Sequence, residues 1–508
     1  MGLCERASSY LVRQLNTSEF ATVEEEDQKR GIFLTLINPL HYRRTQLTEA
    51  YVDIPKEMDR GCFNLVDPQG NHLEKEVLER SEFMPVVEQL INRPKYLEMI
   101  RYRVLIKAEN LAPYALKAYH VQPAAPESGQ QDAAHDLQLE NQYLKVAFNE
   151  DGSLNVTDKE RGVTYSQAGY FFDEGEAGQA WIHESYGMEV DTLNTQARIS
   201  KSFTSSMFNE VQVEHELKLP ANLEERGKEK PGMATCSVVL RVGLKDGSRH
   251  LEMNMDVDNH AESHRLRVMF PSGLQATHSY GEGQFDVVRR SLERPDTSDW
   301  VEQPMYDFPM HHFVDLTDGD KGMAVLVDGL KEYEVLPDDH NTLAITLSRG
   351  FEYKINPAAP QDYSHEKGSQ MLGKNSYRLA LYPHKGDWQQ GEVYKESFLF
   401  NYPLRVVQSG PLHGEQGAEM SFLEVLPDDL VVSSVKKAED PNFQGFVLRL
   451  YNPTEQDIDG HARLMEAPED VWQVTMEEKF LKRPDIQPDG SFKFHAGPKQ
   501  ILTLKIKY

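Results

Sequence analysis

Cysteine is scarce in this chain, and its scarcity excludes two kinds of cross-link. The 508 residues include only Cys4, Cys62 and Cys236, an odd number at wide spacing. Such thiols form neither the disulfide framework of a small secreted domain nor a cysteine-based zinc site. We therefore expect a cytoplasmic protein whose stability comes from hydrophobic cores.

Basic residues and long apolar runs are also in short supply. The chain has 54 Lys and Arg against 81 Asp and Glu, which gives a formal net charge of −27. This charge repels nucleic-acid phosphates and anionic lipids, so we expect neither nucleic acid nor a membrane as a partner. No window is long and apolar enough to span a bilayer, and the N-terminus lacks the apolar core of a secretory signal.

The chain is instead rich in short strand-like runs that are separated by turn residues. The region around residues 305–349 shows this most clearly. Its apolar runs His312–Leu316, Met323–Val327 and Leu343–Leu347 are separated by Asp-Gly and Pro-Asp turns. Short strands joined by such turns predict an antiparallel meander.

The same pattern recurs from Gly31 to the C-terminus and predicts a mainly β, multi-domain protein of antiparallel β-sandwiches. Leu251–Val257, for example, alternates apolar and polar residues, which is typical of a strand with one buried face. The predicted parts are a helical segment (1–30), a small β domain (31–122), a Pro- and Gln-rich linker (123–136), a large β-sandwich domain (137–410) and a small C-terminal β domain (411–508).

Several segments resemble glycoside hydrolase family 38, the zinc α-mannosidases, and in particular its bacterial mannosylglycerate-hydrolase type. The motifs that carry the resemblance are Asn38–Leu40 (NPL), Asp258–Pro271 (DNHAESHRLRVMFP), Phe308–Val335, Tyr377–Trp388 (YRLALYPHKGDW), Ser421–Asp440 (SFLEVLPDDLVVSSVKKAED) and Val447–Thr454 (VLRLYNPT). One position departs from the family pattern, because Ser263 stands where Asp is usual. The resemblance extends over nearly the whole chain but covers only the C-terminal half of such enzymes. It implies a large central β-sandwich with smaller flanking β domains.

The resemblance also implies an activity whose essential residues are missing from this sequence. A complete enzyme of the family would be a zinc-dependent retaining hydrolase of α-mannosides, with mannosylglycerate or its phosphorylated form as a candidate substrate here. Its N-terminal half would bind zinc through a His-x-Asp pair and the nucleophilic Asp. None of the 18 histidines here is followed by Asp two residues later. We therefore expect no catalytic residue, metal site or cofactor in this chain, which would be inactive alone, and we expect zinc in the missing catalytic half.

The expected partners are that N-terminal catalytic domain, or a separate chain that carries it, and a carbohydrate. Whether the chain forms a homo-oligomer stays open. The alternative is a stand-alone carbohydrate-binding or structural β module, or a non-catalytic subunit. A concave aromatic groove would favour the alternative. An exposed apolar patch around Leu3–Leu15 and Tyr306–His312 would favour the first interpretation, in which the chain is part of a larger enzyme. The reason is that a broken domain interface leaves such a patch.

The first residues predict a short amphipathic helix. Leu3, Ala7, Leu11 and Leu15 share one helical face, and the acidic run Glu24–Asp27 follows. A lone amphipathic helix cannot bury its apolar stripe against itself. It either packs on the first β domain or is the last helix of a bundle, and the family resemblance favours the bundle.

The densest group of His and Asp residues is Asp307, His311, His312 and Asp315. Neighbouring residues of a strand point to opposite faces, so His311 and His312 are poorly placed to bind one ion. We therefore interpret Asp307, His311 and His312 as candidates for contacts with the substrate, or with the catalytic half, at the rim of the β domain.

Two further groups suit a sugar. One is a charged group in a loop region, Asp286, Arg289 and Arg290. Of these, Arg289 would suit an acidic sugar, because a guanidinium binds a carboxylate through two hydrogen bonds. Tyr382, with His384 and Trp388, would stack on a sugar ring, although core packing explains the same residues.

A third pair, His260 and His264, has the spacing of a zinc protease motif. That motif requires a helix with a Glu directly after the first His. Here Ala261 follows His260 in a strand–turn context, which favours a structural role for both histidines.

Overall fold

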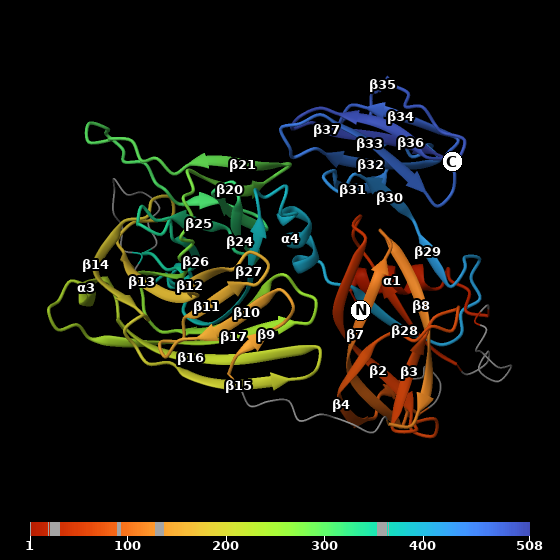
Figure 1. Ribbon diagram of the computed structural model, residues 1–508, viewed down its shortest axis with the longest axis horizontal. Coiled ribbons are helices and arrows are strands. Elements are labelled where there is room, and N and C mark those ends of the chain that lie inside the picture. The colour runs from red at the N-terminus through yellow and green to blue at the C-terminus, as the bar shows by residue number, and fades with distance from the viewer. Residues whose placement is uncertain are drawn as a thin grey trace. The chain divides into compact units, whose positions relative to one another are not determined.

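The computed structural model describes residues 2–18, 20, 31–88, 93–126, 137–352, 363 and 365–508 (Figure 1). The chain forms two compact units: unit 1 contains Met1–Asp132 and Tyr402–Tyr508, and unit 2 contains Ala133–Asn401. All pairings between the named strands are antiparallel, which confirms the predicted mainly β fold. The acidic run Glu24–Asp27 and residues 127–136 of the predicted linker lie outside the described residues.

The first domain of unit 1 consists of two sheets around one core. The strand order of one sheet is β28 (Arg405–Ser409), β1 (Ile32–Ile37), β8 (Ala115–Ala124) and β29 (Glu419–Ser421), with β3 (Cys62–Val66) also paired to β8. The order of the other is β2 (Arg44–Pro55), β7 (Met99–Leu111) and β4 (Lys75–Phe83), and a separate ribbon pairs β5 (Val86–Val87) with β6 (Lys95–Tyr96). The two sheets share a buried core that includes Leu34, Val52, Phe63 and Tyr102.

The strand β28 corrects one predicted domain boundary. The sequence-based division placed residues up to 410 in the large sandwich. In the structure, Arg405–Ser409 pairs with β1 of the first domain, and the chain leaves unit 2 after Asn401. The reason is that β28 forms the edge of this sheet by pairing with β1, which comes from the N-terminal part of the chain.

The helix α1 (Leu3–Val12) packs on this first domain through one end of its apolar stripe. Val12 and Leu15 are buried in a cluster with Phe33 from β1. Leu3 and Leu11 are 77% and 41% exposed. The domain therefore covers only part of the predicted stripe, and membership of a larger helical bundle stays a prediction.

The C-terminal domain of unit 1 is a second, smaller sandwich. One sheet has the order β30 (Leu423–Leu426), β33 (Ile458–Leu464) and β36 (Phe492–Ala496). The other has the order β31 (Val431–Lys437), β32 (Gly445–Tyr451), β37 (Ile501–Lys507), β34 (Asp470–Val474) and β35 (Phe480–Lys482). Alternate residues of β33 and β36 are buried, so each of these strands presents one face to the core and one to solvent.

Unit 2 is the large predicted sandwich, in which three sheets share one hydrophobic core. The nine-stranded sheet has the order β15 (Arg198–Thr204), β16 (Phe208–Pro220), β17 (Met233–Lys245), β18 (Leu251–Asn259), β27 (Gly373–Lys385), β24 (Lys321–Asp328), β23 (Phe313–Thr317), β20 (His278–Gly283) and β21 (Asp286–Ser291). The six-stranded sheet has the order β14 (Ser185–Asp191), β13 (Tyr170–Glu176), β19 (His264–Phe270), β26 (Leu343–Arg349), β25 (Glu332–Val335) and β22 (Phe308–Pro309). The four-stranded sheet has the order β12 (Val163–Ala168), β11 (Leu154–Asp158), β10 (Leu144–Phe148) and β9 (Leu139–Glu140).

Helices are few in unit 2. Among the described residues of this unit they are α3 (Leu223–Arg226), α4 (Val393–Asn401) and the 3-10 turn η1 (Gly368–Gln370). The helix α4 packs against β23, β24 and β27 of the nine-stranded sheet. Across the described parts of both units, no helix has the length and apolar character needed to cross a bilayer.

The predicted meander of residues 305–349 is correct in its strands but wrong in their pairing. The first two runs form β23 and β24, which pair with each other in the nine-stranded sheet. The third run forms β26, which belongs to the six-stranded sheet and pairs with β25 and β19. After β24 the chain crosses to the other sheet, because β24 is already flanked on both sides by β23 and β27.

Candidate functional site

The segment that carries the predicted site residues crosses between the two large sheets of unit 2. Phe308 and Pro309 pair with β25 of the six-stranded sheet, and the chain enters β23 of the nine-stranded sheet at Phe313. The side chains of Asp307, His312 and Asp315 therefore bond to three different partners. The segment joins the sheets but does not bring its own polar side chains to one point.

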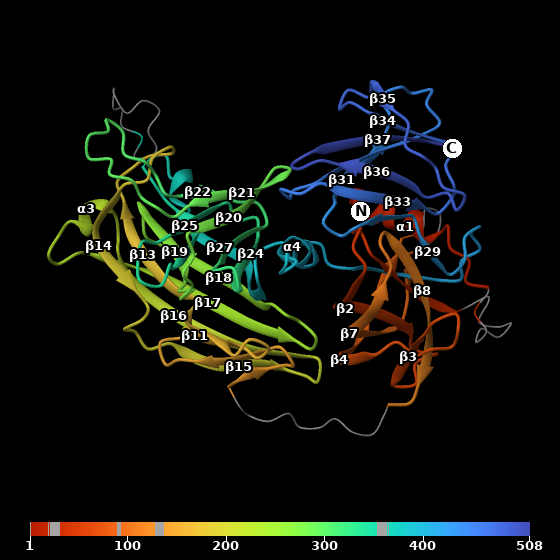
Figure 2. The ribbon, with the colours of Figure 1, turned by 45° about the horizontal axis from the view of Figure 1, so that its top comes forward.

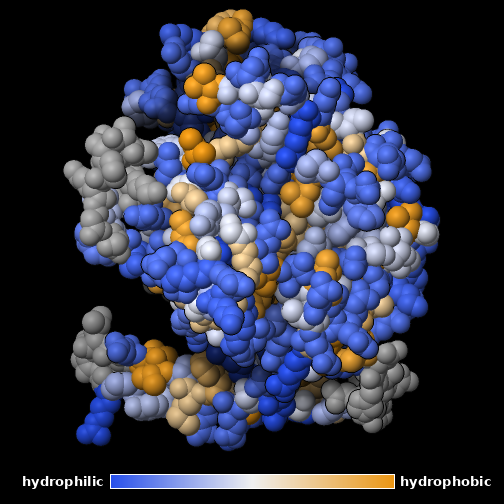
Figure 3. All heavy atoms as spheres, turned by 90° about the vertical axis from the view of Figure 1, so that its left-hand side faces the viewer, coloured by the Kyte–Doolittle hydropathy of each residue, from blue (hydrophilic) through white to orange (hydrophobic). Residues whose placement is uncertain are grey.

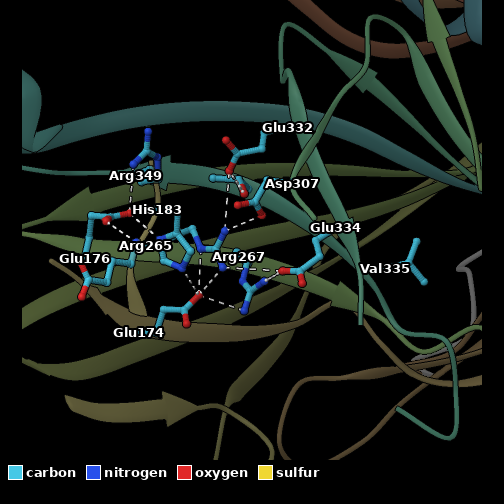
Figure 4. A network of polar contacts seen from close by, with 12 residues as sticks. Glu174, Glu176, His183, Arg265, Arg267, Asp307, Glu332, Glu334, Val335 and Arg349 are labelled. Carbon is cyan, nitrogen blue, oxygen red and sulfur yellow. Dashed lines mark hydrogen bonds and ion pairs between the residues drawn. The ribbon is translucent and has the colours of Figure 1, made fainter. Parts of the chain in front are cut away.

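Asp307 belongs to a buried charge network on one face of the six-stranded sheet (Figure 4). The network centres on Arg265 of β19, whose Nη1 donates to Asp307 Oδ1 at 2.7 Å and whose Nη2 donates to Glu174 Oε1 at 2.6 Å. The neighbouring Arg267 Nη1 donates to Glu334 Oε2 at 2.8 Å. Alternation along antiparallel strands places these residues on one face, since Glu174 lies directly opposite Arg265 in the β13–β19 pair.

The network continues toward the end of β13. The Nδ1 atom of His183 lies 2.6 Å from Glu176 Oε2, and Arg349 Nη1 donates to the same oxygen at 3.1 Å. Figure 4 shows these groups beside the Arg265 cluster. The Arg349 guanidinium also donates to the carbonyl oxygens of Gln179 and Ala180, so it fastens the loop between β13 and β14 to the sheet.

The positive groups of this network lower the pKa values of two of its carboxyl groups, those of Glu174 and Glu176. Burial by itself raises the pKa of Glu174, but the nearby Arg267 and Arg265 lower it below its ordinary value. Burial likewise raises the pKa of Glu176, but the hydrogen bond from His183, together with those from the Glu184 backbone and from Arg349, lowers it below its ordinary value. A glycosidase acid needs a carboxyl group held protonated near neutral pH, with a second carboxylate close by. Glu174 and Glu176 instead act as fixed anions that hold arginines, which is a structural role.

His312 belongs to a different cluster, at the edge of the nine-stranded sheet. Its backbone N–H donates to Glu282 Oε2 at 2.8 Å, and its Nδ1 lies 2.8 Å from the same oxygen. The hydroxyl of Tyr394, from α4, donates to Glu282 Oε1 at 2.8 Å. The Glu282 side chain is 4% exposed and that of His312 is 23% exposed, so one part of the imidazole reaches the surface. His311 lies next to it, with its Nε2 2.8 Å from the Gln284 amide nitrogen.

We expect Glu282→Gln to lower the free energy of unfolding by about 1–3 kcal/mol, because a neutral amide replaces a buried, charged acceptor of several hydrogen bonds. Chemical denaturation should show the loss, and hydrogen exchange should become faster in residues 310–316. Gln284→Ala is the matched control, since it removes an exposed contact of the adjacent His311. Equal effects of the two substitutions would contradict a central role of Glu282.

Asp315 is paired with His384 inside the sandwich. The His384 Nε2 lies 2.7 Å from Asp315 Oδ1, and the two side chains are 2% and 0% exposed. Burial raises the pKa of Asp315 above its ordinary value, although His384 opposes the rise. The ring fits only because residue 322 is glycine, since a Cβ there would lie 2.1 Å from His384 Cε1. The pair therefore links β23 to β27 across the intervening β24 and is closed to a substrate.

The remaining candidates fall at separate places. Tyr382 is 5% exposed and its hydroxyl donates to the Gly391 carbonyl oxygen, so it packs in the core and offers no open ring face to a sugar. Arg289 is exposed on β21, with its Nη2 3.4 Å from His278 Nδ1. His264 is buried, and its Nδ1 lies 2.5 Å from Asp173 Oδ2, as a structural histidine requires.

A zinc ion does not fit the His and Asp residues that the sequence places together. Arg265 holds Asp307, Glu282 holds His312 and His384 holds Asp315. Among the described residues, no group of three or more His, Cys, Asp or Glu side chains is arranged to hold a metal ion. No local pattern in the sequence marks Glu282 or Gly322, because their partners are distant in the chain.

Exposed apolar side chains are dispersed. The predicted patch is present only in part: Leu3 and Leu11 are exposed, whereas residues 304–308 are half-buried and Met310 is buried. Figure 3 shows one face of the molecule, on which hydrophobic side chains occur in small groups among hydrophilic ones.

Comparison with known proteins gives matches to two family descriptions. Residues 139–358 match "Glycosyl hydrolases family 38 C-terminal domain", and residues 429–504 match "Glycosyl hydrolases family 38 C-terminal beta sandwich domain". The first match covers most of unit 2 and the second covers most of the C-terminal sandwich.

Individual relatives agree with these matches. The chain is 26% identical over 390 residues to a "Putative mannosylglycerate hydrolase" of Halalkalibacterium halodurans, a match that covers 73% of this chain and 41% of that protein. It is 26% identical over 274 residues to human "Alpha-mannosidase 2C1", covering 53% of this chain and 24% of that protein. The chain thus matches less than half the length of either relative.

A solved structure has the same fold. The crystal structure of an alpha-mannosidase from Enterococcus faecalis V583 superposes with a TM-score of 0.82 at 20% identity. The superposition covers 99% of this chain and 58% of that one. At this identity the similarity concerns the arrangement of the domains' strands and carries no residue roles.

Proposed function

This chain belongs to glycosyl hydrolase family 38 through its two C-terminal domains, and from this premise we propose that it is the non-catalytic β portion of a zinc-dependent retaining α-mannosidase. The observation that carries the proposal is that both matched domains are C-terminal ones. The proposed partner is a catalytic half, on the same or another chain, that supplies the zinc and the nucleophile. The proposed role of this part is to form the β scaffold on which that half is held.

The chemistry of the described residues supports the proposal that catalysis belongs to the other half of the enzyme. Retaining hydrolysis needs two carboxyl groups about 5 Å apart, one of them protonated. Two carboxylates that share His183 as a partner, Glu174 and Glu176, have lowered pKa values and bind arginines. The carboxyl group with a pKa raised by burial, that of Asp315, is 0% exposed.

The proposed substrate class is α-mannosides, and mannosylglycerate is a specific candidate. The support for mannosylglycerate is the name of the Halalkalibacterium halodurans relative. The substrate would be bound by the catalytic half. The surface-exposed part of His312 is the proposed contact of this chain with that half or with the substrate.

We expect the purified 508-residue chain to release no nitrophenol from an aryl α-mannoside, with or without added zinc. The measurement is the rate of hydrolysis in zinc and in chelator, with the intact Halalkalibacterium halodurans relative as a positive control and a thermal melt to show that the chain is folded. Zinc-dependent turnover that a chelator abolishes would overturn the proposal, and substitutions at His311, His312 and Asp315 would then locate the site.

A further inference from the structure

The helix α4 contacts two separate polar clusters of unit 2 through two different sides. In Figure 1 and in Figure 2 it lies beside β24, against which it packs. Tyr394 and Phe398 are four residues apart and share one side of the helix, whereas Glu396 and Phe400 share another. Each of these pairs contacts a different histidine of the sandwich.

The first side of α4 holds the imidazole of His312 in place. The Tyr394 hydroxyl donates to Glu282 Oε1, and the other oxygen of that carboxylate lies 2.8 Å from His312 Nδ1. The centroid of the Phe398 ring lies 5.3 Å from that of His312 and 5.4 Å from that of Tyr394. A displacement of α4 therefore removes a hydrogen bond from the carboxylate that orients His312, and it also removes a ring that packs on the imidazole.

The second side of α4 is held by a histidine that lies between two carboxylates. His250 Nδ1 lies 3.2 Å from Glu396 Oε2, and its Nε2 lies 3.7 Å from Glu252 Oε1. The Phe400 ring packs edge-to-face on the imidazole, with 5.8 Å between the centroids. A carboxylate only accepts hydrogen bonds, so one carboxylate at each ring nitrogen favours the imidazolium, in which both nitrogens carry a proton.

The charges around His250 balance only while this residue is protonated. Lys245 Nζ lies 2.7 Å from Glu252 Oε1, so two cations face two carboxylates. Tyr382 of β27 lies near Glu396, and burial raises the pKa of its hydroxyl so far that it stays uncharged. Deprotonation of His250 leaves one excess negative charge among side chains that are at most 25% exposed, which is unfavourable. Among the described residues Glu396 has no other ion pair, so α4 loses its cation.

We propose that α4 couples the protonation of His250 to the position of the His312 imidazole. When His250 releases its proton to solvent, the side of the helix that carries Glu396 loosens. The hydrogen bond from Tyr394 to Glu282 then weakens, and His312 loses its fixed orientation. This inference rests on the proposed function, in which His312 contacts the catalytic half or the substrate. It adds that this contact is strongest while His250 is protonated.

Hydrogen exchange of the full chain at pH 6 and pH 9.5, measured by mass spectrometry, tests the coupling. Division by the intrinsic exchange rate at each pH gives the protection that the structure provides. We expect the protection of residues 393–401 to fall by about 100-fold, because the pKa of His250 is 6.5 when the helix is open and about 9 when it is closed. Residues 310–316 should lose at least about tenfold, whereas residues 211–219 of β16 should change by less than about twofold.

Substitutions separate the two steps of the coupling. His250→Gln should show low protection of both segments already at pH 6 and no further fall at pH 9.5, because glutamine does not titrate in this range. Tyr394→Phe should remove the pH dependence of residues 310–316 but retain that of residues 393–401, because it removes the hydrogen bond to Glu282 and leaves His250 in place. His260→Gln, at a histidine whose side chain is 62% exposed, is the matched control.

Four results would overturn the proposal. The first two are protection of residues 393–401 that does not change with pH, and a loosened helix beside unchanged residues 310–316. The others are an undiminished pH dependence of residues 310–316 in Tyr394→Phe, and an equal fall in β16, which would mean that the whole unit unfolds. The experiment uses neither zinc nor substrate nor a catalytic half. Its failure therefore leaves the proposed hydrolase function in place, and turnover by the chain alone leaves the coupling in place.

Discussion

Replacement of Arg265 by methionine is expected to lower the free energy of unfolding of unit 2 by about 3–5 kcal/mol. The Arg265 side chain is 3% exposed, and its partners Glu174 and Asp307 are 6% and 8% exposed. Without the guanidinium, two buried carboxylates lose their main donor. The desolvation of an unpaired buried charge is far less favourable than the loss of a pair at the surface.

A surface pair of the same unit provides the comparison. Arg241 Nη1 donates to Asp256 Oδ2 at 2.8 Å, with the side chains 36% and 49% exposed. Arg241→Met should lower stability by no more than about 1 kcal/mol. Chemical denaturation measures both variants, and hydrogen exchange shows whether the loss is local to β13, β19 and the segment at Asp307. Similar losses in the two variants would mean that the Arg265 network contributes no more than a surface ion pair.

A third variant tests how much of the lost stability comes from the carboxylates that Arg265→Met leaves unpaired. In the triple variant Arg265→Met, Glu174→Gln and Asp307→Asn, no buried carboxylate remains without its cation. We expect it to recover part of the stability that Arg265→Met loses, because replacing a whole buried ion cluster is less unfavourable than removing one member. A triple variant that is less stable than the single one would show that the network is stabilising in itself.

The second large effect is a loss of stability at alkaline pH that depends on His250. Its Nδ1 lies 3.2 Å from Glu396 of α4 and its Nε2 lies 3.7 Å from Glu252 of β18. Burial lowers the pKa of His250, but these two carboxylates raise it from 6.5 to about 9. The imidazolium is thus the form that holds α4 to the sheet. A shift of this size corresponds to about 3 kcal/mol of stability.

The sign follows from the raised pKa in the folded state. Below pH 6.5 the histidine is protonated in both the folded and the unfolded chain, and the full contribution is present. Between pH 6.5 and about 9 the unfolded chain releases its proton first, so the stability falls. The partner Glu252 has the opposite pH dependence. Burial raises its pKa, but Lys245 and His250 lower it more. Its contribution to stability is therefore lost only as the pH falls below the pKa that the carboxyl group has in the unfolded chain.

The measurement is the free energy of unfolding at pH 6 and pH 9.5 for the chain and for His250→Gln. We expect the unsubstituted chain to lose about 3 kcal/mol more than the variant over this range. His260→Gln, the same substitution at a histidine whose side chain is 62% exposed, is the matched control. An unchanged alkaline loss in His250→Gln would show that another group is responsible.

The local sequence pattern was sufficient to predict the strands and the fold class. Leu251–Val257 alternates in sequence and its apolar residues are buried in β18, because the backbone of a strand turns successive side chains to opposite faces. The family resemblance, carried by contiguous motifs, was confirmed by the two domain matches. These features depend on residues that are close together in the chain.

The pairings that define the polar clusters were decided by the tertiary structure alone. Glu174 and Arg265 are 91 residues apart, Asp315 and His384 are 69 apart, and Glu282 and His312 are 30 apart. The sequence grouped Asp307, His312 and Asp315 because they are neighbours, whereas the fold gives each a partner on another strand. Backbone geometry determines which face of a sheet a side chain occupies, but the packing of distant strands determines which residues that side chain contacts.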